Sequence, residues 1–231
     1  LTKIGVKGFK VASCDISNFP LLKKIALKKL PILLSTGASN LNEVRTAVNF
    51  VKKNGNKKIC VMHCTLCYPT QPKDINFSGL IDIKKNFKDL ALGLSDHTLG
   101  IHSSSTSVAL GVRAIEKHFT VDKKLKKSAD HWLSINPKEL KQMRKNVDEV
   151  LLSLGKGGKK VLKCEKKTRL LARRSIVLKI DLKKGTKLSE KNITCKRPGN
   201  GMSPKFFDKI LGKKIKKDLS VDHQLKFSDL T

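Results

Sequence analysis

Short apolar runs alternate with amphipathic segments through the first two-thirds of the chain. Each run is rich in β-forming residues and ends in a small or polar residue, which is typical of a strand buried on both faces. We expect five such strands, at residues 10–15, 32–37, 58–65, 92–98 and 114–120. Because helical segments separate them at regular spacing, the pattern predicts a parallel sheet covered by helices.

Two of the intervening segments carry clear helix signals. Residues 41–53 place apolar side chains three and four positions apart, Asn40 precedes them as a cap, and Glu43 stands at the third helical position. A second helix is expected after Asn136 and stops at Gly155, with the same spacing of apolar residues. Each helix therefore has one face for a hydrophobic core.

The pattern changes after the second of these helices. A stretch rich in lysine and glycine is typical of a flexible charged linker. Short strands are expected beyond it at residues 174–179 and 193–196, with turns between them and a short helix near residues 204–211. The predicted parts are an α/β domain, a linker and a small β-rich domain, at residues 1–155, 156–168 and 169–231.

Polar or ionisable residues end every predicted strand. They are Ser13, Ser35, His63, Asp96, His97, Glu116, Lys117 and His118. In a (β/α)8 barrel the carboxyl ends of all strands face one pocket. An open dinucleotide-binding sheet would instead carry a glycine-rich phosphate turn, and the sequence has no G-x-G-x-x-G motif. We therefore predict an α/β fold, an incomplete TIM barrel with about five of its eight units, and expect about three units upstream of Leu1.

Two kinds of site are consistent with these strand ends. His97 and His118 follow consecutive strands, so both imidazoles can converge on one catalytic metal, although two buried and satisfied histidines remain the alternative. One lysine and three serine hydroxyls are suited to cradling a phosphate group, and they are Lys10, Ser13, Ser35 and Ser95.

Cys60, Cys64 and Cys67 have the spacing C-x3-C-x2-C, which also occurs in radical-type iron–sulfur enzymes and resembles a zinc knuckle. On a strand, however, Cys60 and Cys64 would lie about 13 Å apart, too far for one cluster. The sequence also lacks a second cysteine pair at a spacing suitable for structural zinc. We interpret Cys60 and Cys64 as packed or buried thiols, and keep an iron–sulfur barrel enzyme as an alternative.

The net charge of +30 raises a further alternative, a non-catalytic protein that binds nucleic acid. Arginine accounts for only seven of the 49 basic residues, the lysines are scattered, and aromatic residues are few. We interpret the lysines as solvated faces and expect no nucleic-acid partner. Six cysteines without an export signal predict a cytoplasmic protein. The sequence contains no apolar run of about 18 residues, so we expect no membrane-spanning segment.

The order of motifs along nearly the whole chain resembles the sialic acid synthase family, which makes N-acetylneuraminic, legionaminic and pseudaminic acids. The motifs are KVASCD, LLSTGAS, MHCTLCYPT, GLSDHTLGI, AIEKHFTVD, DHWLS, ARRSIV and KRPGNGMSP. The resemblance implies a partial TIM barrel followed by a small β-clip, antifreeze-like (SAF) domain. It also implies a homodimer in which the SAF domain covers the partner's site.

The resemblance implies a reaction and roles for individual residues. Phosphoenolpyruvate condenses with N-acetylmannosamine or a related N-acyl hexosamine, and phosphate leaves by C–O cleavage. His97 and His118 match the ligands of a divalent metal, usually Mn²⁺, with Mg²⁺ or Co²⁺ as alternatives. Phosphoenolpyruvate contacts match Lys10, Ser13, Ser35 and Ser95. Other active-site positions match Tyr68, Asp130 and Glu116, with Glu116 as acid or base, and Arg197 matches the arginine that reaches the acyl group of the sugar across the dimer.

Three departures from the family pattern concern the site. Cys14 replaces a common glycine, and Leu66 and Cys67 stand where an amide or hydroxyl is usual. One extra residue precedes the motif that contains Asp130.

The resemblance places a substrate lysine and other contacts in barrel strands upstream of the sequence. We therefore predict that the 231-residue chain alone does not condense phosphoenolpyruvate with N-acetylmannosamine. A phosphate-release assay measures this directly, and turnover by the chain alone would contradict it.

Overall fold

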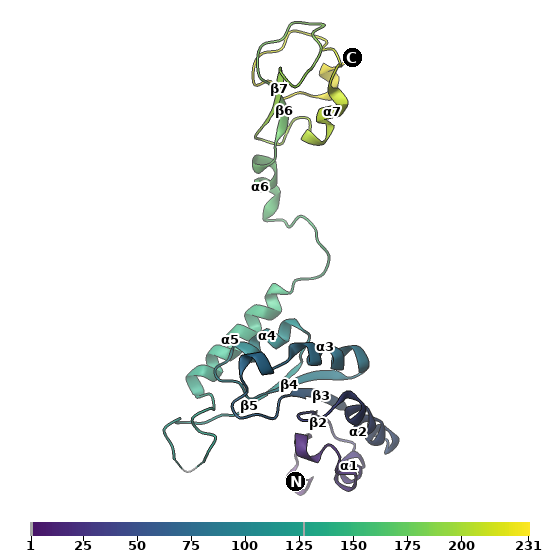
Figure 1. The fold of residues 1–231 in the computed structure, drawn as a ribbon, viewed down its shortest axis with the longest axis vertical. Helices are drawn as coiled ribbons and strands as arrows, with labels where there is room; N and C mark the ends of the chain where they lie inside the picture. The colour runs from purple at the N-terminus through teal and green to yellow at the C-terminus, as the bar shows by residue number, and fades with distance from the viewer. Residues whose placement is uncertain (1, 127) are drawn as a thin grey trace. The chain divides into compact units, whose positions relative to one another are not determined.

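The structure is a computed structural model that describes residues 2–126 and 128–231 (Figure 1). Its buried apolar side chains form two separate hydrophobic cores, one in each of two units. The first unit extends to Gly157 and the second begins at Gly158. Each unit contains its own sheet.

The first unit is built on a parallel sheet with the order β1-β2-β3-β4-β5. The strands are β1 (Phe9–Val11), β2 (Ile32–Ser35), β3 (Ile59–Cys64), β4 (Ala91–Asp96) and β5 (Ala114–Lys117). Each strand pairs in parallel with the next one along the chain. The five predicted strands are confirmed. Each predicted range runs on past the end of its strand, because the polar residues that follow lie in loops at the carboxyl edge of the sheet.

Helices connect these strands and one follows the last. They are α1 (Phe19–Ala26), α2 (Leu41–Lys53), α3 (Phe77–Asn86), α4 (His102–Ala109) and α5 (Pro137–Ser153), with short 3-10 turns η1 (Thr2–Ile4), η2 (Ser13–Asp15) and η3 (Pro72–Asp74). In the first turn of α2, Glu43 N donates to the Asn40 side chain and Asn40 N donates to Glu43 Oε2. Asn136 and Glu139 form the same reciprocal cap on α5. Both predicted helices are confirmed, with their starts fixed by these caps.

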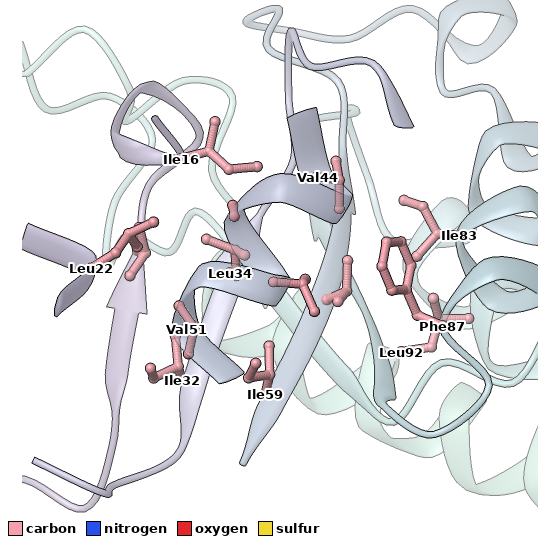
Figure 2. Close-up of a cluster of buried hydrophobic side chains, with 14 of the residues drawn as sticks. Ile16, Leu22, Ile32, Leu34, Val44, Val51, Ile59, Ile83, Phe87 and Leu92 are labelled. Atoms are coloured by element: carbon pink, nitrogen blue, oxygen red, sulfur yellow. The ribbon is translucent and has the colours of Figure 1, made fainter. Parts of the chain in front are cut away.

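Alternate residues of each strand point toward the helices and build the core. Figure 2 shows Val51 of α2 close to Ile32 of β2 and Ile59 of β3, which are also register partners. The same cluster takes in Leu34, and Phe87 beyond α3. Because side chains alternate across a strand, the residues between these apolar positions face the opposite side of the sheet.

A buried ion pair joins the carboxyl ends of β4 and β5. Lys117 Nζ lies 3.0 Å from Asp96 Oδ2, and the two side chains are 3% and 0% exposed. Asp96 also accepts from Thr98 N, Thr98 Oγ1 and Ser104 Oγ, and Lys117 donates to the Thr98 carbonyl. Burial lowers the pKa of Lys117, and the charge of Asp96 partly offsets this. The network is fully paired, as a buried charge requires.

The second unit holds a two-stranded antiparallel sheet. Its elements are α6 (Glu165–Ala172), β6 (Ser175–Leu178), β7 (Ile193–Lys196), η4 (Pro204–Phe206), α7 (Phe207–Ile210) and η5 (Phe227–Asp229). Ile176, Ile210 and Leu225 lie in its core. The expected strands and short helix are present. The last residues of the predicted linker are helical, since α6 begins at Glu165. This helix is tied to the second unit by a hydrogen bond from Gly199 N to the Leu170 carbonyl.

No helix in the described part of the chain is long and apolar enough to cross a membrane.

Replacing Lys117 with methionine should destabilise the first unit by about 3–5 kcal/mol, because Asp96 would keep its buried charge and lose its cation. Urea unfolding followed by circular dichroism measures this. Lys52→Met is the matched control, since Lys52 pairs with a largely exposed Asp89 and its loss should change stability little. Equal effects of the two substitutions would contradict the prediction.

Candidate functional site

The predicted site residues of the first unit gather on the side of the sheet opposite the helix-packed core. Lys10 Nζ of β1 lies 3.2 Å from Glu116 Oε2 of β5. These are the first and last strands of the sheet and are not neighbours. A side-chain contact between them therefore requires the sheet to curl, as the wall of a barrel does.

The serine hydroxyls lie at the carboxyl ends of three strands. Ser13, on η2 after β1, is buried, and its Oγ accepts a 2.9 Å hydrogen bond from Gly37 N. Ser35 and Ser95 are also buried. Within the described residues Ser35 Oγ has no hydrogen-bond partner. A buried hydroxyl in this state needs an explanation, and a bound anion is one.

Gly37 lies against this cluster with no room for a side chain. A Cβ atom there would lie 2.8 Å from Ser13 Oγ and 3.0 Å from Cys64 Sγ. The loop after β2 can therefore lie this close to Ser13 only because residue 37 is a glycine.

His97 is held in one tautomer by the backbone. Its Nδ1 lies 2.9 Å from the Thr65 carbonyl oxygen, and because a carbonyl only accepts, Nδ1 carries the hydrogen. The other nitrogen, Nε2, then keeps its lone pair when the ring is neutral. Burial lowers the pKa of His97, but contacts with Cys64 and with the Thr65 carbonyl outweigh it and leave the pKa raised.

Tyr68, His118 and Asp130 meet His97 at the same place. The Tyr68 ring centroid lies 4.1 Å from that of His97 and 5.4 Å from that of His118. His118 Nδ1 is 3.5 Å from Asp130 Oδ2. Burial, followed by the charges of Cys64 and Asp130, raises the pKa of Tyr68. The structure thus brings all nine predicted site residues of the first unit to one region.

Two imidazoles form the donor set for the expected metal. The His97 and His118 ring centroids are 5.3 Å apart. Metal-binding histidines usually donate the hydrogen of their other ring nitrogen to a carbonyl or a carboxylate. Nδ1 of His97 lies beside the Thr65 carbonyl in this way, and Nδ1 of His118 lies beside the Asp130 carboxylate. Among the described residues no group of three or more His, Cys, Asp and Glu side chains is placed to hold a metal. The residues therefore fit a cation that also takes water or substrate oxygens, and not a closed zinc site.

His63 is an exception among the strand ends. Its Nε2 lies 2.7 Å from the Ile75 carbonyl oxygen, and a Cβ on Gly79 of α3 would touch its ring at 3.2 Å. His63 therefore does not join the other predicted residues around His97 and Lys10, although it lines a cavity of about 620 Å³ beside α3. His63 precedes Cys64 by one residue, so it points to the helix side of the sheet.

The cysteines divide into a packed thiol, a site thiol and exposed ones. Burial raises the pKa of Cys60 to about 11, as expected for a packed thiol. Cys64, which we interpreted as a packed or buried thiol, is buried but lies among polar groups, with Sγ 3.5 Å from Ser13 Oγ and 3.9 Å from His97 Nδ1. Burial raises the pKa of the Cys64 thiol, but hydrogen bonds with His97 and Ser13 outweigh it, so the pKa is lowered. Cys67 is exposed.

Cavities of about 570 and 620 Å³ flank the loop after β3. Ser13 and Cys14 line the first, Cys64 and Thr65 line the second, and Leu66 lines both. The departures from the family pattern at Cys14 and Leu66 thus lie on the walls of these cavities.

Arg197 belongs to the second unit, where it follows β7 and is exposed. Its expected contact with a sugar across a dimer stays a prediction.

Comparison with known proteins places this site in a family. The NeuB family model matches residues 1–159, and the SAF domain model matches residues 173–231. The chain belongs to the NeuB family. The N,N'-diacetyllegionaminic acid synthase of Campylobacter jejuni is 42% identical over 228 residues, which cover 98% of this chain and 68% of that protein. The human N-acetylneuraminate-9-phosphate synthase is 35% identical over 216 residues, or 93% of this chain and 60% of that one.

A solved structure gives the same result for the NeuB fold. The N-acetylneuraminic acid synthetase of Leptospira borgpetersenii in complex with citrate has a TM-score of 0.68 and 35% identity, over 73% of this chain and 58% of that one. The chain thus spans about two-thirds or less of the length of these three relatives. The sialic acid synthase resemblance, the partial barrel and the SAF domain are confirmed. The roles of the individual residues stay predictions.

If Cys60 is a packed thiol, its alkylation by iodoacetamide at pH 8 should be about 100-fold slower in the folded chain than in urea. The raised pKa keeps Cys60 protonated at pH 8, so the rate in the folded chain should rise with pH until about 11. Peptide mass spectrometry measures the rates, with the exposed Cys67 as an internal control. Fast labelling of Cys60 in the folded chain at neutral pH would contradict this.

Proposed function

We propose that this chain carries much of the active site of a nonulosonic acid synthase. The enzyme condenses phosphoenolpyruvate with N-acetylmannosamine or a related N-acyl hexosamine, forms a sialic-acid-type product and releases phosphate. The observation that carries the proposal is that the Lys10 ammonium group, buried serine hydroxyls, two imidazoles and the Glu116 carboxylate converge on one face of the sheet. Relatives named as legionaminic acid and N-acetylneuraminate-9-phosphate synthases support it.

The phosphate group would bind to Lys10 and the serine hydroxyls. Ser35 has an unpartnered hydroxyl. Ser13 accepts from Gly37 N and donates only to the weak acceptor Cys64 Sγ, so its own hydrogen can turn toward an anion. Lys10 is paired with Glu116. A phosphate dianion is a stronger partner for an ammonium group than one carboxylate. Binding would therefore draw Lys10 away from Glu116.

Glu116 would then be free for proton transfer. Its Oε2 has no hydrogen-bond partner among the described residues, although Lys10 lies 3.2 Å away. Carbon 3 of phosphoenolpyruvate attacks the sugar aldehyde, and water adds at carbon 2 before phosphate leaves. We propose that Glu116 takes a proton in this sequence, as a general base placed at the site.

The two histidines would hold a divalent cation, most simply Mn²⁺. When bound, the cation supplies Lewis-acid polarisation of the aldehyde. Tyr68 packs on both imidazoles, and Asp130 lies beside His118, so these two side chains would orient the ligand rings.

Arg197 and the SAF domain would complete the site in a homodimer, where Arg197 reaches the acyl group of the sugar bound by the partner. The six free cysteines are consistent with the reducing cytoplasm that we propose for this reaction.

The test of this function is a phosphate-release assay with Mn²⁺, phosphoenolpyruvate and a panel of N-acyl hexosamines. It uses this chain extended by the barrel units that the resemblance expects upstream of residue 1. We expect phosphate release that depends on both the sugar and Mn²⁺. Release without the sugar, or no release with any sugar tested, would contradict the proposal.

In the same extended protein, His97→Gln should abolish Mn²⁺ binding and phosphate release, because one of the two imidazole ligands is lost. Cys60→Ser and Cys67→Ser should leave the Mn²⁺ content unchanged, because neither thiol belongs to the donor set. Isothermal titration with Mn²⁺ measures binding. Metal loss in a cysteine variant with His97 intact would contradict the assignment and revive the cluster alternative.

A further inference from the structure

Cys64 lies between two groups that come from strands far apart in the sheet. Ser13 follows β1 and His97 follows β4, and both β2 and β3 separate these strands. Cys64, the last residue of β3, contacts both, with Sγ 3.5 Å from Ser13 Oγ and 3.9 Å from His97 Nδ1. It is 7% exposed, so the contact excludes water.

We propose that Cys64 is a positioning residue that sets the spacing between the Ser13 hydroxyl and the His97 imidazole. The inference rests on the proposed function, in which Ser13 faces the phosphate group and His97 faces the metal. In this role the thiol acts through Ser13 and His97 and is not itself a ligand. It contacts His97 on the Nδ1 side, whereas the lone pair of the ring is on Nε2.

The chemistry of sulfur suits this role. Ser13 Oγ already accepts from Gly37 N, so its hydroxyl hydrogen can point toward Cys64 Sγ. A thiol sulfur is a weak acceptor. It therefore holds the serine oxygen in place by contact but gives up the hydroxyl hydrogen readily to a phosphate oxygen. A strong acceptor at residue 64 would compete with the phosphate for that hydrogen.

The same balance applies to His97. The Nδ1 hydrogen is directed to the Thr65 carbonyl at 2.9 Å, and the sulfur at 3.9 Å is a second, weaker contact on the same side. Thr65 fixes the tautomer, and Cys64 fixes how far the ring can move toward β1. Gly37 also lies close to the sulfur, since a Cβ there would be 3.0 Å from Sγ.

Cys60 provides a matched control within the same strand. It lies four residues before Cys64 and so on the same face of β3. Its Sγ is near Gly93, where a Cβ would lie 3.1 Å away. Cys60→Ala and Cys64→Ala therefore remove the same atom from the same face, but only the second removes the contacts with Ser13 and His97.

The experiment compares Cys64→Ala, Cys64→Val, Cys64→Ser and Cys60→Ala in the same extended protein that tests the proposed function. Long-range ¹H–¹⁵N spectra report the ring nitrogens of His97, identified with the His97→Gln variant. Isothermal titration gives the affinity for phosphoenolpyruvate. Valine fills the space of the thiol without an acceptor, and serine restores an acceptor, so the set separates packing from positioning. Urea unfolding identifies any variant that fails to fold.

In Cys64→Ala and Cys64→Val we expect shifted His97 ring resonances and an affinity for phosphoenolpyruvate lowered by about tenfold, the usual effect of one lost hydrogen bond. Cys64→Ser should recover part of the effect on the His97 resonances but not the affinity, because its hydroxyl is a stronger acceptor than the thiol and competes for the Ser13 hydrogen. Cys60→Ala should match the unsubstituted protein. His97 resonances or an affinity in Cys64→Val equal to those in Cys60→Ala would overturn the inference. If the unsubstituted extended protein binds no phosphoenolpyruvate, the proposed function fails, and the His97 spectra still decide the role of Cys64.

Discussion

A lysine and an aspartate without access to water hold the chemically active edge of the sheet together. Asp96 and Lys117 are register partners at the ends of β4 and β5, and the next residue of each strand is a candidate metal ligand. A buried charge is tolerated only when every polar atom around it is paired. Thr98 and Ser104 supply the remaining partners, so the loop after β4 is fixed by the same network. The positions of His97 and His118 thus follow from an electrostatic requirement on the opposite face of the sheet.

That division of faces organises the whole first unit. Ile32, Ile59 and their neighbours face the helices, while the residues between them carry lysine, serine, thiol, imidazole and carboxylate groups. A parallel strand in a closed barrel is buried on both faces, so the site face also contains apolar residues such as Met62. The concentration of polar groups at the carboxyl edge follows from this, because the residues deeper in the sheet have no water to face.

The sequence alone predicted the five strands, the two capped helices and the set of residues at the strand ends. The family motifs supplied the roles of Tyr68, Asp130 and Arg197, which no periodicity indicates. The faces of β3 were harder to predict. Residues 59–64 form an apolar run interrupted only by His63, and such a run does not reveal which alternate set faces the site. Cys64 is buried as expected, but its polar neighbours were not predicted, and neither was the position of His63 on the helix side. The register of β3 with β4 places Cys64 beside Ser95, and this pairing depends on contacts far apart in the chain.

The crowding around Gly37 has a consequence for attempts to change the sugar that the proposed synthase would accept. The loop after β2 and the loop after β3 both border the same cavities, yet they differ in freedom. At Gly37 any side chain would collide with Ser13 and Cys64, so the position is closed to variation. Leu66 is 46% exposed, and its side chain lies on the wall of both cavities. A library built to broaden substrate range should therefore keep Gly37 constant and vary Leu66, where size and polarity can change without disturbing the groups that do the chemistry.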